Sequence, residues 1–294
     1  MRIIDGKKIS YQIKEEIKHE VENIISKGGK PPHLAAVLVG EDGASLTYVV
    51  SKVRSCKQVG FKSTLVKLPE DILEKDLLLK IDELNNNNEI DGYIVQLPLP
   101  KHIDEEKILL AVNPNKDVDG FHPTNFGKMA LNMKTFIPAT PFGIMELLKR
   151  YKIKTSGKNT VVIGRSNIVG RPISILMNSK GNPGDSTVTV VHSRTINLES
   201  YTKNADIIIS ALGIPGFVKK EMVKDGVVII DVGITRVKDN NSPKGYVIRG
   251  DVDFDSVKEK ASYITPVPGG VGPMTIAMLL KNTLLSKSLL KKNY

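Results

Sequence analysis

Three polar side chains, those of Tyr48, Lys52 and Gln96, are candidates for a site of proton transfer. Tyr48 and Lys52 are four residues apart in a stretch with helical periodicity, so they share one face of the predicted helix. Desolvation can lower the pKa of a lysine beside a tyrosine in a partly apolar site, and such a lysine can exchange protons near neutral pH. Gln96 ends an apolar strand, in Gln96-Leu97-Pro98-Leu99-Pro100, and offers both a donor and an acceptor. The alternative is a solvated lysine over a packed tyrosine, with a glutamine that faces water.

A glycine turn at residues 164–170 is the second candidate site. The β-branched apolar run Thr160–Ile163 precedes Gly164, and Gly170 opens an apolar helical pattern. A strand, a glycine turn and a helix together point backbone N–H groups at a phosphate. A second strand, Thr187–Val191, follows about a helix later, as a βαβ unit requires. The alternative is a tight turn without a ligand.

The residues around this turn favour NADP over NAD. An NAD site carries an acidic residue near the tip of the second strand, whereas this tip reads His192-Ser193-Arg194-Thr195. Arg165 and Arg171 flank the turn itself. Cations and hydroxyls suit the additional phosphate of NADP.

Two aspartates in Lys116-Asp117-Val118-Asp119-Gly120 resemble the start of a calcium loop. Counted from Asn115, however, the twelfth position is Phe126 rather than Glu, which excludes an EF-hand. The histidines are scattered and there is one cysteine, so no metal site is expected. Either aspartate could still hydrogen-bond a ligand.

Composition indicates a globular chain long enough for two domains. It has 294 residues, of which 40% are hydrophobic and 25% charged. No transmembrane-length apolar run or signal peptide is found, so we expect a cytoplasmic protein without a membrane partner. The net charge of +10 raises nucleic acid as a partner, but the lysines are spread out and aromatic residues make up only 5%. A basic surface that attracts anionic small molecules is therefore favoured.

Alternating strands and helices predict an α/β fold with a parallel sheet. In the first part, strands are expected at Leu34–Val39, Thr64–Leu68 and Ile90–Leu97, and helices at 9–25, 45–59 and 73–84. Thr140 is predicted to cap a helix that begins at Pro141, which places a domain boundary near 139. The second part has strands at 207–210, 227–232 and 263–265, a hairpin turn at 240–245 and a final helix at 275–290.

Together the motifs resemble the family of bifunctional methylenetetrahydrofolate dehydrogenases and methenyltetrahydrofolate cyclohydrolases. The resemblance rests, in the family's order, on residues 45–52, 96–100, 116–120, 164–170 and on Pro266-Val-Pro-Gly-Gly-Val-Gly-Pro-Met-Thr275. It implies a two-domain α/β protein with a cleft between the domains, usually a homodimer. Residues 1–139, completed by the C-terminal helix 268–294, would form the folate-binding catalytic domain. Residues 140–267 would form a Rossmann-like NADP-binding domain.

The resemblance also implies roles for single residues. Lys52 matches the catalytic lysine, Tyr48 a tyrosine of the folate pocket, Gln96 the glutamine that tunes the lysine, and Asp119 the aspartate that holds the pterin ring. The other expected substrate-binding residues are Leu97, Pro98, Pro268, Gly269 and Gly272. The expected cofactor-binding residues are Gly164, Arg165, Ser166, Arg171, Ser193 and Ile234.

The activity implied by the resemblance has two steps. NADP oxidises 5,10-methylenetetrahydrofolate to 5,10-methenyltetrahydrofolate, which is then hydrolysed to 10-formyltetrahydrofolate. Folates with anionic polyglutamate tails would suit the basic surface.

Two other functions remain as alternatives. An NADP-dependent amino- or hydroxy-acid dehydrogenase of similar architecture would explain the nucleotide motif but not Tyr48, Lys52 or the loop at 268–275. A nucleic-acid-binding protein would explain the charge, but the sequence has no basic stripe or recognition motif.

Overall fold

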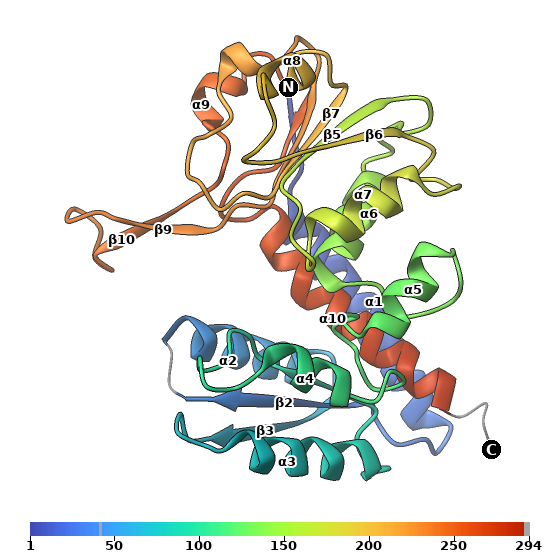
Figure 1. Ribbon diagram of the computed structural model, residues 1–294. Coiled ribbons are helices and arrows are strands. Elements are labelled where there is room, and N and C mark those ends of the chain that lie inside the picture. The colour runs from blue at the N-terminus through green and yellow to red at the C-terminus, as the bar shows by residue number, and fades with distance from the viewer. Residues whose placement is uncertain (41–42, 291–294) are drawn as a thin grey trace. The chain divides into compact units, whose positions relative to one another are not determined.

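The computed structural model describes residues 1–40 and 43–290 (Figure 1). The chain forms two compact units. The six-strand unit contains residues 1–10 and 140–275, and the three-strand unit contains residues 11–139 and the C-terminal residues from Ile276. Two long helices, α1 (Gly6–Ser26) and α10 (Val271–Leu290), contribute residues to both units. Each unit has a parallel sheet with helices, which confirms the predicted α/β class.

The main sheet of the six-strand unit is entirely parallel, in the order β1-β11-β8-β7-β5-β6. Its strands are β1 (Arg2–Ile3), β5 (Asn159–Ile163), β6 (Thr187–Val191), β7 (Ile207–Ser210), β8 (Val228–Asp231) and β11 (Tyr263–Ile264). Ile163 is in register with Val191 and with Ser210, and Ser210 is in register with Asp231. The carboxyl ends of the four neighbouring strands β8, β7, β5 and β6 therefore meet at one edge, where ligands of parallel sheets bind.

Helices lie on both faces of this sheet (Figure 1). α6 (Ala139–Arg150) and α7 (Gly170–Asn178) lie on one side, and α8 (Leu198–Thr202) and α9 (Phe254–Val257) on the other. A short 3₁₀ helix, Lys220–Met222, joins the second group. Because both faces are covered, the inner strands β5, β7 and β8 are nearly continuous runs of buried residues, whereas the edge strand β6 is mostly unburied.

A two-stranded antiparallel ribbon extends the six-strand unit. It consists of β9 (Thr235–Lys238) and β10 (Tyr246–Arg249), which pair only with each other. The intervening residues form the expected hairpin turn.

The three-strand unit has a parallel sheet in the order β3-β2-β4. Its elements are β2 (His33–Val39), β3 (Lys62–Leu68), β4 (Gly92–Val95), α2 (Gly43–Gln58), α3 (Glu74–Asn86), α4 (Glu105–Ala111) and α5 (Pro123–Ala130). All seven residues of β2 are buried. Ala35, Val37 and Val39 pack with Leu77 and Ile81 of α3. The central strand thus anchors the unit, and its carboxyl end leads toward α2.

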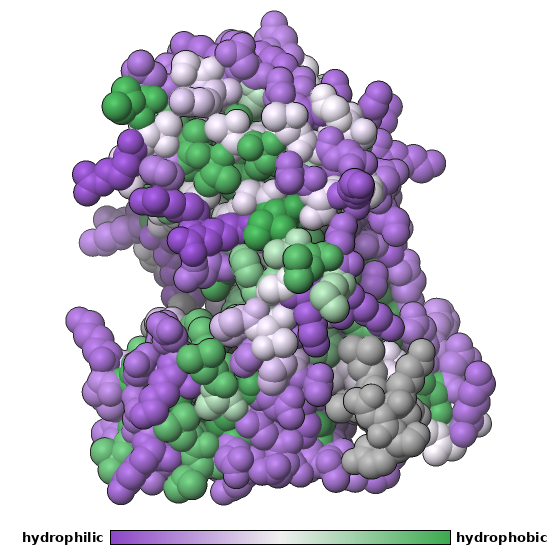
Figure 2. Space-filling view, turned by 45° about the vertical axis from the view of Figure 1, so that its right-hand side comes forward, coloured by the Kyte–Doolittle hydropathy of each residue, from purple (hydrophilic) through white to green (hydrophobic). Residues whose placement is uncertain are grey.

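The visible surface is mainly polar. Figure 2 shows a face on which purple hydrophilic side chains predominate and green apolar ones form small, separate groups. Within the described residues, no helix combines the length and the apolar character that a membrane crossing needs.

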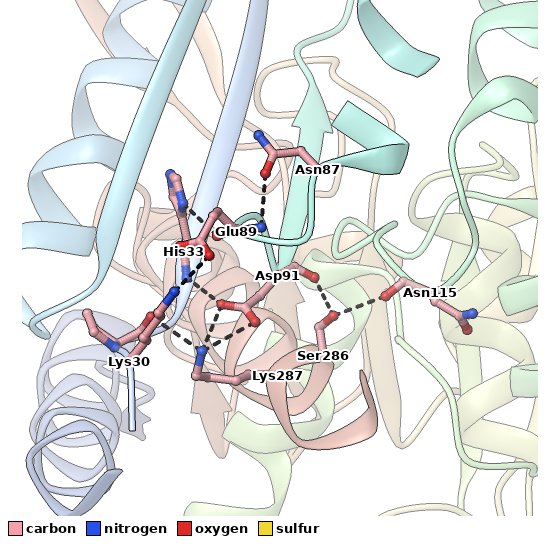
Figure 3. A network of polar contacts seen from close by, with 9 residues as sticks. Lys30, His33, Asn87, Glu89, Asp91, Asn115, Ser286 and Lys287 are labelled. Carbon is pink, nitrogen blue, oxygen red and sulfur yellow. Dashed lines mark hydrogen bonds and ion pairs between the residues drawn. The ribbon is translucent and has the colours of Figure 1, made fainter. Parts of the chain in front are cut away.

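A polar network fastens α10 to the sheet of the three-strand unit (Figure 3). Lys287 pairs with Asp91, with its ammonium 3.3 Å from one carboxylate oxygen. The same oxygen accepts a hydrogen bond from the backbone N–H of His33 at 2.8 Å. Ser286 donates to the carbonyl oxygens of Asp91 and Asn115. Both partners of the ion pair are about 12% exposed, so removing one would leave a largely buried charge.

Several local predictions were wrong. α6 begins at Ala139, so Thr140 is inside the first turn, and its hydroxyl lies 3.0 Å from that of Thr275 instead of capping the helix. α10 begins at Val271, four positions before the predicted start, because the glycine-rich stretch itself forms the first turn. Five short elements were not predicted from the sequence: β1, α4, α5, α8 and α9.

Candidate functional site

The three-strand unit brings Lys52 and Gln96 into direct contact. Lys52 lies on α2 with 9% of its surface exposed, and its ammonium donates to Gln96 Oε1 at 3.0 Å. Gln96 follows β4 directly, and its backbone N–H donates to Val37 O at 2.9 Å. Gln96 Nε2 donates to Leu97 O at 2.6 Å, which leaves Oε1 directed at the lysine. The sheet edge therefore holds an amide oxygen against an enclosed ammonium.

Burial dominates the ionisation of Lys52 and Asp119. It lowers the pKa of the Lys52 ammonium, and the Asp119 carboxylate opposes this shift. Burial also raises the pKa of Asp119, where Lys52 acts in the opposite direction and Asp117 adds to the rise. Both groups are therefore shifted toward their neutral forms. A lysine with a lowered pKa can accept a proton near neutral pH and return it.

Apolar surface borders this pair of groups. Tyr48 lies one turn before Lys52 on α2 and is 43% exposed. Leu97 is partly buried and Pro98 is exposed, and the peptide bond between them is cis. The side chain of Ser45 lies outside the described residues. The arrangement offers an aromatic face and a proline next to a group that can transfer protons.

The two aspartates of residues 116–120 have different surroundings. The Asp117 carboxylate accepts hydrogen bonds from the backbone N–H groups of Gly120 and His122, at 3.1 and 2.8 Å, and from Asn125 Nδ2 at 2.9 Å. These hydrogen bonds use the Asp117 carboxylate to hold the loop conformation. The Asp119 carboxylate instead acts electrostatically on Lys52. Residue types alone left the two aspartates equivalent, and only the family resemblance singled out Asp119.

Asn282 on α10 holds the same loop and was missed. Its Nδ2 donates to Val118 O at 2.8 Å and to Ile137 O at 2.9 Å. Its Oδ1 is the only buried side-chain polar atom without a hydrogen-bond partner within the described part of the chain. The available signal was weak, because Asn282 lies between Lys281 and Thr283 in a helix with several polar residues.

The glycine turn lies in the six-strand unit, between β5 and α7. Gly164 has φ +115°, and an added Cβ would overlap the carbonyl oxygen of Ala211. A Cβ on Gly170 would overlap the carbonyl oxygen of Gly164. The Ser166 hydroxyl accepts from the backbone N–H of Gly170 at 3.3 Å, so it caps the start of α7. Both glycines are needed for this close approach of strand and helix.

Cationic and hydroxyl side chains surround the turn at the carboxyl edge of the sheet. Arg165 and Arg171 are exposed, and so is Ser193, which follows β6. Ile234, which follows β8, is 45% exposed. No acidic residue occurs at 192–195. The donor set fits a dinucleotide that carries an additional phosphate.

The proline- and glycine-rich loop also belongs to the six-strand unit. Gly269 has φ +111°, and its carbonyl oxygen accepts from Lys7 N at 2.9 Å. A Cβ on Gly272 would lie 3.2 Å from Ile234 Cδ1, and Pro268 is exposed. The expected substrate-binding residues are thus divided between the two units.

Metal ligands do not gather within the described part of either unit. Across residues 1–40 and 43–290, no group of three or more His, Cys, Asp or Glu side chains is arranged to hold an ion. Cys56 is buried, and burial raises the pKa of its thiol to about 12, so it is a packing residue rather than a nucleophile.

Comparison with known proteins gives matches over nearly the whole chain. Residues 4–119 match the catalytic domain of tetrahydrofolate dehydrogenase/cyclohydrolase, and residues 138–291 match its NAD(P)-binding domain. The chain is 71% identical over 289 residues to the bifunctional protein FolD of Flavobacterium johnsoniae, covering 98% of both chains.

Two solved structures have the same architecture. The bifunctional FolD enzyme of Campylobacter jejuni, a methylenetetrahydrofolate dehydrogenase/cyclohydrolase, superposes with a TM-score of 0.93 at 48% identity over 99% of each chain. The Trypanosoma brucei methylenetetrahydrofolate dehydrogenase-cyclohydrolase, in complex with NADP cofactor and an inhibitor, has a TM-score of 0.92 at 38% identity over 98% of each chain.

Proposed function

The chain belongs to the tetrahydrofolate dehydrogenase/cyclohydrolase family. From that premise we propose which unit carries the cyclohydrolase chemistry and which binds NADP. It oxidises 5,10-methylenetetrahydrofolate to 5,10-methenyltetrahydrofolate with NADP and hydrolyses the product to 10-formyltetrahydrofolate. These reactions interconvert tetrahydrofolates in one-carbon metabolism. The family match does not favour an amino- or hydroxy-acid dehydrogenase.

In our proposal the three-strand unit carries the cyclohydrolase chemistry. The methenyl substrate is a cation, and water must add to its one-carbon bridge before the ring opens. Neutral Lys52 accepts a proton from the attacking water and then gives it to the folate nitrogen as the carbon–nitrogen bond breaks. The hydroxyl of the adduct loses its proton to solvent in the same step and becomes the formyl oxygen. The contact that carries this role is the 3.0 Å hydrogen bond from the enclosed ammonium to Gln96.

Gln96 orients this lysine, and Asp119 acts on its charge. The amide oxygen of Gln96 orients the amino group without adding a charge, so the burial-driven lowering of the Lys52 pKa is retained. Asp119 restores part of the charged form, and it is also our candidate for holding the pterin ring through hydrogen bonds. Tyr48, Leu97 and Pro98 supply the apolar surface against which the folate lies.

The six-strand unit is our candidate for holding NADP. When bound, NADP accepts the hydride that the one-carbon bridge of the folate loses. The backbone of Gly164 and the start of α7 face the pyrophosphate, with Ser166 shaping the turn. Arg165, Arg171 and Ser193 hold the additional phosphate, and Ile234 packs against the cofactor.

Domain roles follow from these assignments. We assign folate binding and catalysis to residues 1–139 with the C-terminal helix 268–294, and NADP binding to residues 140–267, although α1 and α10 contribute to both units. Pro268, Gly269 and Gly272 remain candidate folate-binding residues of the six-strand unit. The net charge of +10 suits polyglutamylated folates, and we infer that the enzyme works in the cytoplasm.

A homodimer is proposed from the β9–β10 ribbon. A two-stranded ribbon alone is marginally stable in water. Tyr246, Val247 and Ile248 in β10 are only partly buried, and both outer edges of the ribbon lack a strand partner within the described residues. A second copy would cover this surface. Sedimentation at equilibrium tests this, because the mass of a single 32.3 kDa chain would contradict it.

A coupled assay tests the proposed function. Purified enzyme receives methylenetetrahydrofolate and NADP, and NADPH and formyltetrahydrofolate are followed separately. We expect NADPH to appear first and the formyl product to follow. NADPH formation with a simple 2-hydroxy acid, and none with methylenetetrahydrofolate, would contradict the proposal.

A further inference from the structure

Two carboxylates are buried at the carboxyl edge of the six-strand sheet. Asp231 is the last residue of β8 and is 4% exposed, and Asp251, shortly after β10, is 0% exposed. Withdrawing a carboxylate from water is costly unless it is well hydrogen-bonded. The bonds that these carboxylates make therefore indicate why acidic residues occupy an otherwise apolar region.

Asp251 binds the loop that follows β7. Its Oδ2 accepts from the backbone N–H of Leu212 at 2.7 Å and from the Ser210 hydroxyl at 3.3 Å. Its Oδ1 accepts from the backbone N–H of Ile214 at 3.0 Å. One side chain thus fixes both the end of the strand and the first residues of its loop.

Asp231 holds Asp251 in turn. Its Oδ1 accepts from the backbone N–H groups of Gly233 and Asp251, each at 2.9 Å, and its Oδ2 accepts from Val252 N at 2.9 Å. A Cβ on Gly233 would overlap Asp251 Oδ1, and a Cβ on Gly250 would overlap Asp231 Oδ2. Both positions therefore require glycine, because any side chain would collide with one of the two carboxylates.

The hydrogen bonds of Asp251 are linked to the glycine turn through one peptide group, the one between Ala211 and Leu212. The N–H of Leu212 and the carbonyl of Ala211 belong to the same planar unit, so fixing one fixes the other. The Ala211 carbonyl oxygen packs against Gly164 and occupies the space that a Cβ atom on this residue would need. Ala211 N also donates to Ile163 O at 2.8 Å. Asp251 thereby sets the surface on which the turn between β5 and α7 rests.

We propose that Asp251, held by Asp231, is a positioning residue for NADP that fixes the Ala211–Leu212 peptide beneath the glycine turn. The inference rests on the assignment of NADP to the six-strand unit. Asp251 does not touch the reacting atoms. Its removal loosens the cofactor site and leaves the proton-transfer groups of the three-strand unit intact.

The variant Asp251→Asn tests this in the full-length enzyme. The amide retains the size of the carboxylate but turns an N–H group toward one of the backbone donors. Because a lost hydrogen bond to a charged group leaves a buried donor unpaired, we expect KM for NADP to rise by about tenfold or more. The dehydrogenase kcat at saturating NADP, and the cyclohydrolase rate on methenyltetrahydrofolate without NADP, should remain within about threefold of wild type.

Asp206→Asn is the matched control. Asp206 lies in the same unit, next to the opposite end of β7, and its carboxylate accepts from Asn159 N at 2.9 Å and from Lys224 Nζ at 2.8 Å. Its replacement makes the same chemical change in the same sheet. We expect a lower Tm with an unchanged KM for NADP.

The outcomes separate the possibilities. If Asp251→Asn lowers Tm without changing KM for NADP, as the control does, Asp251 is only structural and the inference is overturned. If Asp251→Asn does not fold, Ser210→Ala removes one bond to the same oxygen and keeps the charge. A rise in KM of about threefold then supports the inference, and an unchanged KM overturns it. Failure of wild type to reduce NADP with methylenetetrahydrofolate would instead refute the proposed function.

Discussion

Replacing Gln96 with Glu puts a carboxylate where the Lys52 ammonium now meets an amide oxygen at 3.0 Å. An opposite charge favours the charged ammonium, so the pKa of Lys52 should rise back toward its usual range. Two unit charges about 4 Å apart attract by about 4 kcal/mol at an effective dielectric constant of about 20. Burying the new carboxylate offsets part of this, which leaves about 2–3 kcal/mol. Since about 1.4 kcal/mol is a factor of ten, neutral Lys52 becomes about 30- to 150-fold scarcer near pH 7.

The assay for this variant is the cyclohydrolase rate across neutral and alkaline pH, followed by the loss of methenyltetrahydrofolate. Burial lowers the pKa of Lys52 in the wild type, so the neutral amine becomes available as pH rises through that lowered value. Gln96→Glu should move this rise to higher pH, with recovery of the rate under alkaline conditions. Gln58→Glu is the control, because it adds the same charge at the exposed end of α2. An equal loss of rate at every pH, or an unchanged profile, would refute the reasoning.

Two further substitutions separate the roles of the units. Asp119→Ala should lower both activities together, by about tenfold or more, because the carboxylate is proposed to hold the ring that both reactions use; loss of one activity alone, measured on each substrate, would argue against a positioning role. Arg165→Ala should weaken NADP binding by about tenfold or more and leave NAD nearly unchanged, since a charge-assisted bond to the additional phosphate is lost. Titration with both cofactors checks this, and equal losses would remove Arg165 from phosphate recognition.

The parts of the fold that were predictable are those whose signal is local. Thr187–Val191 and Ile207–Ser210 were predicted with the bounds observed, because both are runs rich in β-branched residues, which favour strands. Ile207–Ser210 is buried throughout, as expected of a strand covered on both faces. The two residues of β1 carry no such signal and become a strand only by pairing with β11, at the other end of the sequence. The first turn of α10 was missed because glycine and proline disfavour helices, whereas here the loop packs against Gly6 at the start of α1.

The candidate site was predictable in its residue types but not in its energetics. Helical spacing put Tyr48 and Lys52 on one face, yet enclosure of Lys52 depends on β4 and on residues around Asp119, which are distant in sequence. Residue types also could not separate Asp117 from Asp119 without the family resemblance, because their roles depend on which backbone N–H groups the loop presents. Asp251 gave no signal at all, since its partners lie on a strand about 40 residues earlier.

The most direct test of the proposed chemistry is to measure both rates in Lys52→Met. Methionine keeps the length and apolar stem of lysine, so the packing of α2 should survive, which circular dichroism and Tm can verify. Hydrolysis requires protons to be moved, whereas hydride loss requires none from the protein. We predict that the cyclohydrolase rate falls by about 10²–10⁴-fold, that the dehydrogenase rate falls less, and that methenyltetrahydrofolate accumulates. A folded variant with unchanged cyclohydrolase activity would contradict the central role of Lys52.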